Sequence, residues 1–221
     1  FGPVKITGPF RGGEFHLDVL DSQFASSLML LGAFTPAPTR IYLHKVHEWP
    51  WLELNAKWLK SMHANISLTR TLLDCKPSQL VISAQANTPC DWSSASFAIG
   101  ACLLSKSAGE IHHMTYPSCQ GDSEIVQWLI EKKLGFMQDN VLHIHPRPYT
   151  GSVLQMDSWI DAVPIMSVIL SQAQTPSILQ DISASTQKEC NRPVAISAML
   201  RKMGGHCQYS ESLHINPTSL K

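Results

Sequence analysis

The feature of this sequence that most constrains its fold is an internal repeat with a period of about seventy residues. In each copy, a few polar residues open a run of small and apolar residues that is typical of a buried helix. These runs lie at residues 22–31, 93–101 and 161–170. A short stretch typical of a strand follows each run, at residues 40–43, 110–114 and 177–182. Self-similarity at a fixed period predicts a fold assembled from repeated supersecondary units.

Each copy continues with an amphipathic helix and then a candidate β-hairpin. Apolar residues at three- and four-residue spacing predict the helices, which end within residues 58–62, 128–135 and 199–205. Gly135 and Gly204 stand where a left-handed residue would end a helix. The clearest hairpin pairs residues 206–210 with 213–216.

The predicted unit is therefore strand, helix, strand, helix, strand, strand, written three times in an α/β fold. Crossover connections favour parallel pairing within a unit, and the final hairpin adds antiparallel strands. The first helix of each unit is so apolar that we expect most of its surface to be buried. Helices inside and sheets facing water would satisfy this pattern. The alternative is a generic α/β sandwich in which the similarity between copies is accidental.

Composition excludes several classes of protein. Of 221 residues, 44% are hydrophobic, and 17 basic side chains balance 17 acidic ones. This composition excludes intrinsic disorder, and a neutral chain lacks the basic excess that binds nucleic acid or anionic membrane. No apolar run is long enough to span a membrane. Because the chain begins at Phe1 without a methionine, we expect it to be part of a longer protein.

The cysteines and histidines indicate a cytoplasmic protein without a bound metal. None of the six cysteines forms a C-x-x-C pair, and in a chain of this length they are typical of reduced thiols. His143 and His145 would share one face of a strand, but the sequence offers them no third ligand.

Residues suited to anion chemistry occur at the starts of the apolar helices and in one further segment. Acidic and hydroxyl residues open each apolar helix, at Asp21-Ser22-Gln23, at residues 91–94 and at Asp161. They could serve only as N-caps, or the helix starts could bind an anionic substrate. The further segment, 187–192, combines Lys188, Glu189 and Arg192 at the start of the last helix. The cations suit carboxylate or phosphate and the acid could carry a proton, although an exposed charged helix start would look the same.

Several motifs in order along the chain resemble one family, the 5-enolpyruvylshikimate-3-phosphate synthases, also called 3-phosphoshikimate 1-carboxyvinyltransferases. The family motif K-E-[ST]-D-R resembles Lys188-Glu189-Cys190-Asn191-Arg192, and S-S-Q-[FY] is similar to Asp21-Ser22-Gln23-Phe24. The remaining matches are Asp91-Trp92-Ser93-Ser94-Ala95-Ser96, Gln120-Gly121-Asp122 and Asp161-Ala162. The likeness to the UDP-N-acetylglucosamine enolpyruvyl transferases is weaker.

The resemblance implies the inside-out α/β barrel fold of the enolpyruvyl transferases, built from βαβαββ units. The family has six units in two domains, and this chain supplies about three. Residues 1–90 would then form one unit of the first-half domain, and residues 91–221 two units of the other domain. The missing segments would complete the site, so we expect this fragment to be inactive alone. The full-length protein is expected to be a monomer.

The resemblance also implies a reaction and assigns roles to residues. The enzyme would transfer the enolpyruvyl group of phosphoenolpyruvate to the 5-hydroxyl of shikimate 3-phosphate in aromatic amino acid biosynthesis, without a cofactor. Asp161 and Glu189 would be the catalytic acids and bases, and Arg192 would bind phosphoenolpyruvate. Shikimate 3-phosphate would be bound by Ser22, Gln23 and Lys188.

Several positions depart from the family motifs, among them Asp21, Glu48, Ala184 and Asn191. Asp21 and Glu48 replace serines where the phosphate would bind, and acids at a phosphate site add like-charge repulsion. Two alternatives therefore stand beside the enzyme. One is a non-catalytic relative with a binding or scaffold role, and the other is an enolpyruvyl transferase with a different acceptor.

Overall fold

The computed structural model describes residues 3–18, 21–82 and 85–218, which form two compact units. The first unit comprises Phe1–Val46 and Trp51–Ala86, and the second comprises His47–Pro50 and Asn87–Lys221. The short segment 47–50 thus belongs to the second unit although it lies between parts of the first. Each unit is described by itself below.

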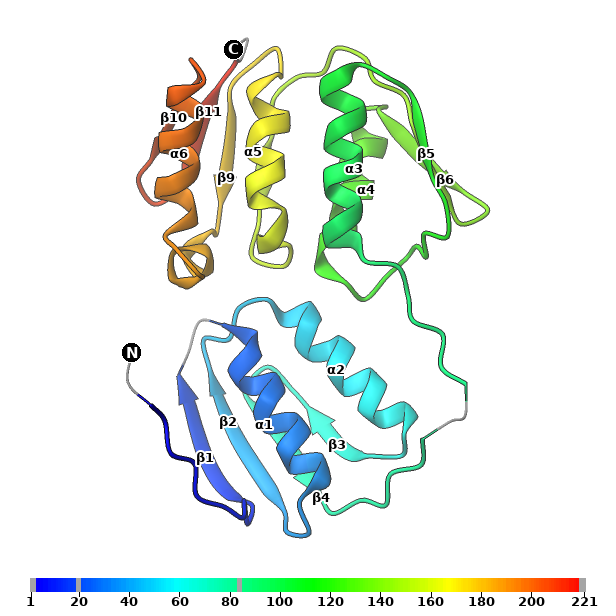
Figure 1. Cartoon of the computed structure of the whole chain (residues 1–221), viewed down its shortest axis with the longest axis vertical. Helices are drawn as coiled ribbons and strands as arrows, with labels where there is room; N and C mark the ends of the chain where they lie inside the picture. Colours follow the sequence, from blue (N-terminus) through cyan, green and yellow to red (C-terminus); the bar gives the residue numbers. More distant parts are fainter. Residues whose placement is uncertain (1–2, 19–20, 83–84, 219–221) are drawn as a thin grey trace. The chain divides into compact units, whose positions relative to one another are not determined.

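The first unit contains one complete copy of the predicted repeat (Figure 1). Its elements are β1 (Gly13–Asp18), α1 (Ser22–Phe34), β2 (Thr39–His44), α2 (Trp49–Ser61), β3 (Asn65–Leu68) and β4 (Leu72–Lys76). The strands form one sheet in the order β1-β2-β4-β3. Strand β1 runs parallel to β2, and the hairpin of β3 and β4 adds antiparallel strands, as the sequence predicts.

The two faces of this sheet differ in polarity, in keeping with helices inside and a sheet facing water. Residues of β2 alternate between buried Ile41 and Leu43 and the more exposed Arg40. Arg40 donates a hydrogen bond across the outer face to the Glu14 carboxylate of β1 at 3.0 Å. Alternation with a period of two is what gives a strand one apolar and one polar face.

The second unit contains the other two copies. The first of them consists of α3 (Trp92–Ser105), β5 (Gly109–Ile111), the 3-10 turn η1 (Gly121–Ser123), α4 (Glu124–Glu131), β6 (Gly135–Gln138) and β7 (Val141–Ile144). Its strands form an antiparallel sheet in the order β5-β7-β6. Parallel pairing is not observed among the three strands described in this copy, because the described residues contain no strand between β4 and α3 that could pair with β5.

The last copy follows the predicted order of elements. These are β8 (Val153–Gln155), η2 (Ile160–Ala162), α5 (Val163–Ser171), β9 (Ser177–Gln180), η3 (Ser183–Gln187), α6 (Arg192–Lys202), β10 (His206–Tyr209) and β11 (Leu213–Asn216). The sheet has the order β10-β11-β9-β8, with β8 parallel to β9 and the other pairs antiparallel. The two copies share one hydrophobic core, in which α3 packs against α5.

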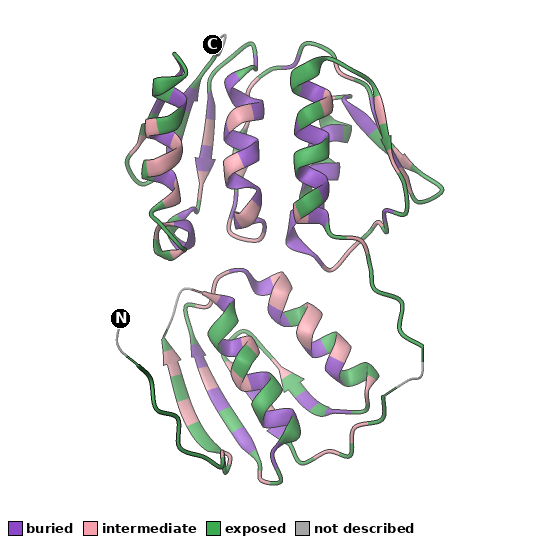
Figure 2. Cartoon of the chain, in the orientation of Figure 1, coloured by how far each residue is buried: buried purple, intermediate pink, exposed green. Residues whose placement is uncertain are grey.

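The prediction that the first helix of each copy is largely buried is confirmed only for α5. Helix α5 has α3, α6 and the strands β9 and β11 as neighbours, so most of its residues are buried. Helices α1 and α3 each leave large apolar side chains exposed, among them Phe34 and Phe97 (Figure 2). An apolar helix is buried on all sides only where other elements surround it.

The local predictions for two glycines have different outcomes. Gly204 takes the predicted left-handed conformation after α6, with φ of 84°. For Gly135 the prediction is wrong, because Lys133 takes the left-handed position with φ of 58° and Gly135 opens β6. A Cβ on Gly135 would lie 2.5 Å from the carbonyl oxygen of His143, so glycine is required there for close packing of the two strands. The strand predicted at 110–114 is shorter and ends at Ile111.

Candidate active site

Four of the sequence-predicted site residues lie at the ends of two elements of the second unit. Asp161 lies in η2, directly before α5, and Lys188 and Glu189 lie in the turn that leads from η3 into α6. Arg192 is the first residue of α6. Helix α6 begins there because Asn191 caps it: the Asn191 side chain accepts a hydrogen bond from the Val194 amide at 3.3 Å. A residue that departs from the family motif thus keeps a structural role.

Arg192 joins the two carboxylates to which the resemblance assigns proton transfer. Its guanidinium donates two hydrogen bonds to Glu189, from Nε at 2.9 Å and from Nη2 at 3.0 Å. Its Nη1 donates a third bond to Asp161 at 2.7 Å. A planar guanidinium can bind one carboxylate with two parallel bonds and still offer a further nitrogen to another acid. The arrangement places two acids around one cation.

The charges of this group are strongly coupled. Hydrogen bonding from Arg192 is the main cause that lowers the pKa of Glu189, and the nearby Lys188 charge adds to it. The same bonds, chiefly those to Glu189, raise the pKa of Arg192. Glu189 is therefore ionised at neutral pH. Its side chain is 67% exposed, whereas that of Arg192 is 19% exposed, so the acid can move and the cation is held.

Lys188 makes a separate ion pair with Glu48, one of the positions that depart from the family motif. The Lys188 ammonium lies 2.6 Å from the Glu48 carboxylate, and the two side chains are 8% and 2% exposed. Glu48 belongs to the segment 47–50, whose residue His47 pairs with Asp157. The pair is therefore almost completely shielded from water, unlike the pair of Arg192 and Glu189.

Asp122 is a buried acid of this site, although the sequence indicates it only as part of a matching tripeptide and not as a site residue. It lies in η1, is 1% exposed and accepts a hydrogen bond from the Ser93 hydroxyl at the start of α3. Burial raises its pKa to about 6, and the charges of Asp161, Asp91 and Glu48 act in the same direction, while the Ser93 bond opposes them. The sequence signal for this residue was its place in the family tripeptide Gln120-Gly121-Asp122, because residue types alone do not show that an acid is buried.

Neighbouring residues fix the position of this tripeptide. The Gln120 side-chain amide donates to the Cys90 carbonyl at 2.5 Å, and its oxygen accepts from the Trp92 amide at 2.9 Å. Asp91 caps α3 by accepting from the Ser93 amide at 3.0 Å. The chain before α3 and the turn η1 are thereby joined, which places Ser93 against Asp122.

The raised pKa of Asp122 predicts how stability depends on pH. The folded protein holds the Asp122 proton up to about pH 6, whereas the unfolded chain releases it near its ordinary value of 3.8. Stability contributed by this group is therefore lost as pH rises from about 4 to 6, by roughly 3 kcal/mol at most. We expect Asp122→Asn to remove this loss. Urea unfolding of the full-length protein at pH 4.5 and pH 7.5 would measure it.

The control for this experiment is Asp139→Asn, which changes an exposed acid in the turn between β6 and β7. Its change in unfolding free energy between the two pH values should match that of the unmodified protein. Equal pH dependence in Asp122→Asn and Asp139→Asn would contradict the assignment of this proton to Asp122.

The predicted residues of the first unit surround the start of α1. Asp21 caps this helix, since its carboxylate accepts from the Gln23 amide at 2.7 Å. Ser22 is 3% exposed, and Gln23 is exposed. The Asp21 carboxylate thus occupies a helix-start amide that an anionic ligand could otherwise use. In the second unit, the departing residue Ala184 is 3% exposed in η3 and contributes only an apolar methyl.

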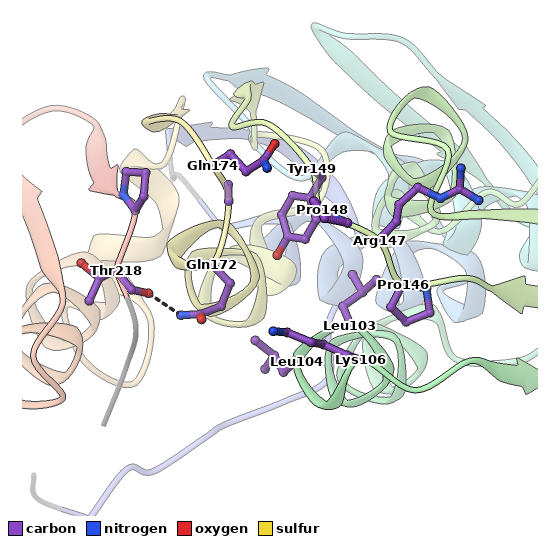
Figure 3. Close-up of a pocket in the computed structure, with 12 residues that line it drawn as sticks. Leu103, Leu104, Lys106, Pro146, Arg147, Pro148, Tyr149, Gln172, Gln174 and Thr218 are labelled. Atoms are coloured by element: carbon purple, nitrogen blue, oxygen red, sulfur yellow. Dashed lines mark hydrogen bonds between the residues drawn. The ribbon is translucent and has the colours of Figure 1, made fainter.

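A cavity of the second unit lies away from these residues. It has a volume of about 610 Å³ and is lined by residues at the end of α3, after β7 and after α5, including Lys106, Arg147, Tyr149 and Gln172 (Figure 3). Gln172 donates a hydrogen bond to the Thr218 carbonyl at 2.8 Å along this wall. Because Asp161 precedes α5 and the cavity adjoins the other end of that helix, the cavity is not part of the candidate active site.

Within residues 3–18, 21–82 and 85–218, no group of three or more His, Cys, Asp or Glu side chains could hold a metal ion. Among the helices in those ranges, none has the length and apolar character that crossing a bilayer requires.

Comparison with known proteins agrees with the motifs. The family model described as EPSP synthase (3-phosphoshikimate 1-carboxyvinyltransferase) matches residues 1–221. A 3-phosphoshikimate 1-carboxyvinyltransferase of Chlamydia muridarum is 33% identical over 224 residues, and one of Chlamydia trachomatis serovar L2 is 31% identical over 222 residues. Each alignment covers 99% of this chain and 50% of the relative, so the chain spans about half the length of these relatives.

Solved structures show the same fold at low sequence identity. An EPSP synthase from Acinetobacter baumannii superimposes with a TM-score of 0.68 and 16% identity, over 95% of this chain and 49% of that one. The enolpyruvyl transferase NikO from Streptomyces tendae gives a TM-score of 0.64 and 14% identity, over 94% of this chain and 52% of that one. The inside-out α/β fold expected from the sequence is thereby confirmed.

Proposed function

Because the chain belongs to the EPSP synthase family, we propose that the full-length protein transfers the enolpyruvyl group of phosphoenolpyruvate to the 5-hydroxyl of shikimate 3-phosphate and releases phosphate. The observation that carries this proposal is the bonding of Arg192 to both Asp161 and Glu189. Two acids held around a cation, one of them able to move, suit a reaction that adds an alcohol across a double bond next to a carboxylate.

Each residue then has a step in the reaction. Arg192 binds the carboxylate of phosphoenolpyruvate, and Asp161 takes the proton of the 5-hydroxyl as that oxygen attacks C2. Glu189 gives a proton to the methylene carbon, which completes the tetrahedral intermediate. Phosphate then leaves, and loss of a proton from the new methyl group forms the enolpyruvyl ether. Lys188 contacts shikimate 3-phosphate near the attacking hydroxyl.

The exposure of Glu189 supports its role as the acid. While Arg192 is hydrogen-bonded to Glu189, it lowers the pKa of Glu189, so the acid holds no proton at neutral pH. When the substrate carboxylate takes the place of Glu189 on the guanidinium, the cause of that lowering is removed. The pKa of Glu189 then rises towards the range in which a carboxyl group can donate.

Further parts of the expectation belong to this proposal. Ser22 and Gln23 bind shikimate 3-phosphate, with Ser22 at the phosphate. Residues 1–90 belong to one domain of the full-length enzyme and residues 91–221 to the other. The full-length enzyme is a monomer of the cytoplasm and uses no cofactor. Since the chain spans about half the length of its curated relatives, the 221-residue chain is expected to be inactive alone.

Substitution of the two acids tests the proposed function. In the full-length protein, Asp161→Asn and Glu189→Gln should each lower kcat for phosphate release by about 10²- to 10⁴-fold, the usual contribution of general acid or base catalysis. The matched controls Asp181→Asn and Glu211→Gln change exposed acids and should retain full activity. Unchanged kcat in both site variants would contradict the assigned roles.

One observation favours a different acceptor or a non-catalytic relative: the Lys188 ammonium is already paired with buried Glu48. The same assay separates these alternatives from the main proposal. Phosphate release with phosphoenolpyruvate and shikimate 3-phosphate supports the main proposal. Release only with another hydroxyl acceptor supports the second reading, and no release with any acceptor supports the non-catalytic one.

A further inference from the structure

The two cations of the candidate site differ in what holds them. Arg192 is bonded to Glu189, whose side chain is 67% exposed and can exchange the guanidinium for water or a substrate. Lys188 is bonded to Glu48, whose side chain is 2% exposed. A carboxylate at this depth cannot leave its partner for water unless the surrounding chain opens. Arg192 is thus available to a substrate carboxylate, whereas the charge of Lys188 is already balanced within the protein.

The conformation of Glu48 is held in place by its surroundings. Its φ is 54°, in the left-handed region that a glutamate adopts only when neighbouring contacts enforce it. On one side His47 pairs with Asp157, and on the other Trp49 is 7% exposed. Glu48 is therefore fixed against Lys188 and is not a surface side chain that reaches it by chance.

An anionic group that approaches Lys188 meets the Glu48 carboxylate at the same place. The acids of this site act on one another electrostatically, since the charges of Asp161 and Glu48 both raise the pKa of Asp122. An acceptor whose hydroxyl contacts Lys188 enters the field of the Glu48 carboxylate, so a phosphate on that acceptor adds to the repulsion.

We propose that Glu48 is a specificity-determining residue, whose carboxylate, fixed beside Lys188, repels the phosphate of the acceptor and weakens the preference for a phosphorylated acceptor. The inference rests on the proposed function, because it concerns the acceptor of that same reaction. Its basis is the shielded pair of Glu48 and Lys188 next to the exposed pair of Glu189 and Arg192.

Calorimetry on the full-length protein tests this inference, with shikimate 3-phosphate and unphosphorylated shikimate as probes. Glu48→Gln should tighten binding of the phosphorylated probe about tenfold or more, in the range of measured couplings between close charges. Binding of shikimate should change less than about threefold, since shikimate lacks the phosphate that the Glu48 carboxylate repels. The control Glu211→Gln, in the exposed turn between β10 and β11, should alter neither.

A second variant covers the case in which Glu48→Gln, with an unbalanced buried lysine, fails to fold. The variant Glu48→Ser also removes the carboxylate, and its smaller side chain leaves room for water beside the Lys188 ammonium. It should likewise bind shikimate 3-phosphate about tenfold more tightly than the unmodified protein, with a change of less than about threefold for shikimate. Unchanged or weaker binding of shikimate 3-phosphate in whichever of the two variants folds would overturn the inference.

Phosphate release by the unmodified protein distinguishes the two proposals. If it turns over both substrates but Glu48→Gln leaves the ratio of the two affinities unchanged, only the inference about Glu48 fails. If neither the unmodified protein nor Glu48→Gln binds either probe or consumes phosphoenolpyruvate, the proposed function fails, and the inference fails with it.

Discussion

Replacing Arg192 by alanine in the full-length protein is expected to lower kcat/KM for phosphoenolpyruvate by about 10²- to 10³-fold, corresponding to roughly 3–4 kcal/mol. The guanidinium has two functions in our proposal, since it binds the substrate carboxylate and also separates the charges of Asp161 and Glu189. Without it, two acids near each other lose their common partner, and the pKa of Glu189 is no longer lowered by Arg192. Steady-state kinetics with varied phosphoenolpyruvate would measure the effect.

Two further variants make this result specific. Arg192→Lys keeps the charge but loses the planar fork that bonds Glu189 twice, so it should recover only part of the activity. Arg201→Ala removes a cation from the other end of α6, where Arg201 donates to the Ser197 carbonyl, and should retain most of the activity. If Arg192→Ala and Arg201→Ala had equal kcat/KM, Arg192 would not bind the substrate.

Substituting Gly121 by alanine should produce the largest loss of stability among single-methyl additions to the second unit. A Cβ at this position would overlap the carbonyl oxygen of Ser158, which belongs to the backbone and cannot rotate away. Overpacking of this kind usually costs about 1–3 kcal/mol, and a backbone clash places Gly121→Ala at about 3 kcal/mol or more. Urea unfolding, followed by tryptophan fluorescence because Trp92 and Trp159 lie in this unit's core, would report the change.

Gly204→Ala is the matched control. Gly204 has φ of 84°, yet nothing lies within 4 Å of its potential Cβ, so only backbone strain of about 1 kcal/mol opposes the methyl group. Gly121→Ala should therefore be clearly the less stable of the two. Equal stabilities would show that the turn η1 relaxes away from Ser158, and Asp122 would not be held as described.

Local patterns were sufficient to predict most of the fold. The spacing of apolar residues predicted α1, α3, α5 and the strands that follow them, because apolar residues recur along the face by which a helix or strand contacts the core. The left-handed Gly204 was likewise predictable from its place after a helix. Gly135 was not, since what requires glycine there is the His143 carbonyl of another strand, which no local pattern records.

The candidate site was predictable to the extent that its residues are close in the sequence or match a motif. Lys188, Glu189 and Arg192 form one segment, and Arg192 bonds to Glu189 only three residues before it in the sequence. The pairing of Lys188 with Glu48 depends on how the segment 47–50 packs within the second unit, so residue types alone could not predict it. The burial of Asp122, which raises its pKa, likewise arises from the packing of η1 against α3.

The most direct test of the proposed function is to incubate the full-length protein with phosphoenolpyruvate and shikimate 3-phosphate and to follow phosphorus and proton NMR spectra together. Our account predicts that inorganic phosphate appears in the same amount as the vinyl protons of an enolpyruvyl ether. It also predicts that Glu189→Gln slows both signals equally. Unchanged spectra, or phosphate release without the ether, would contradict it.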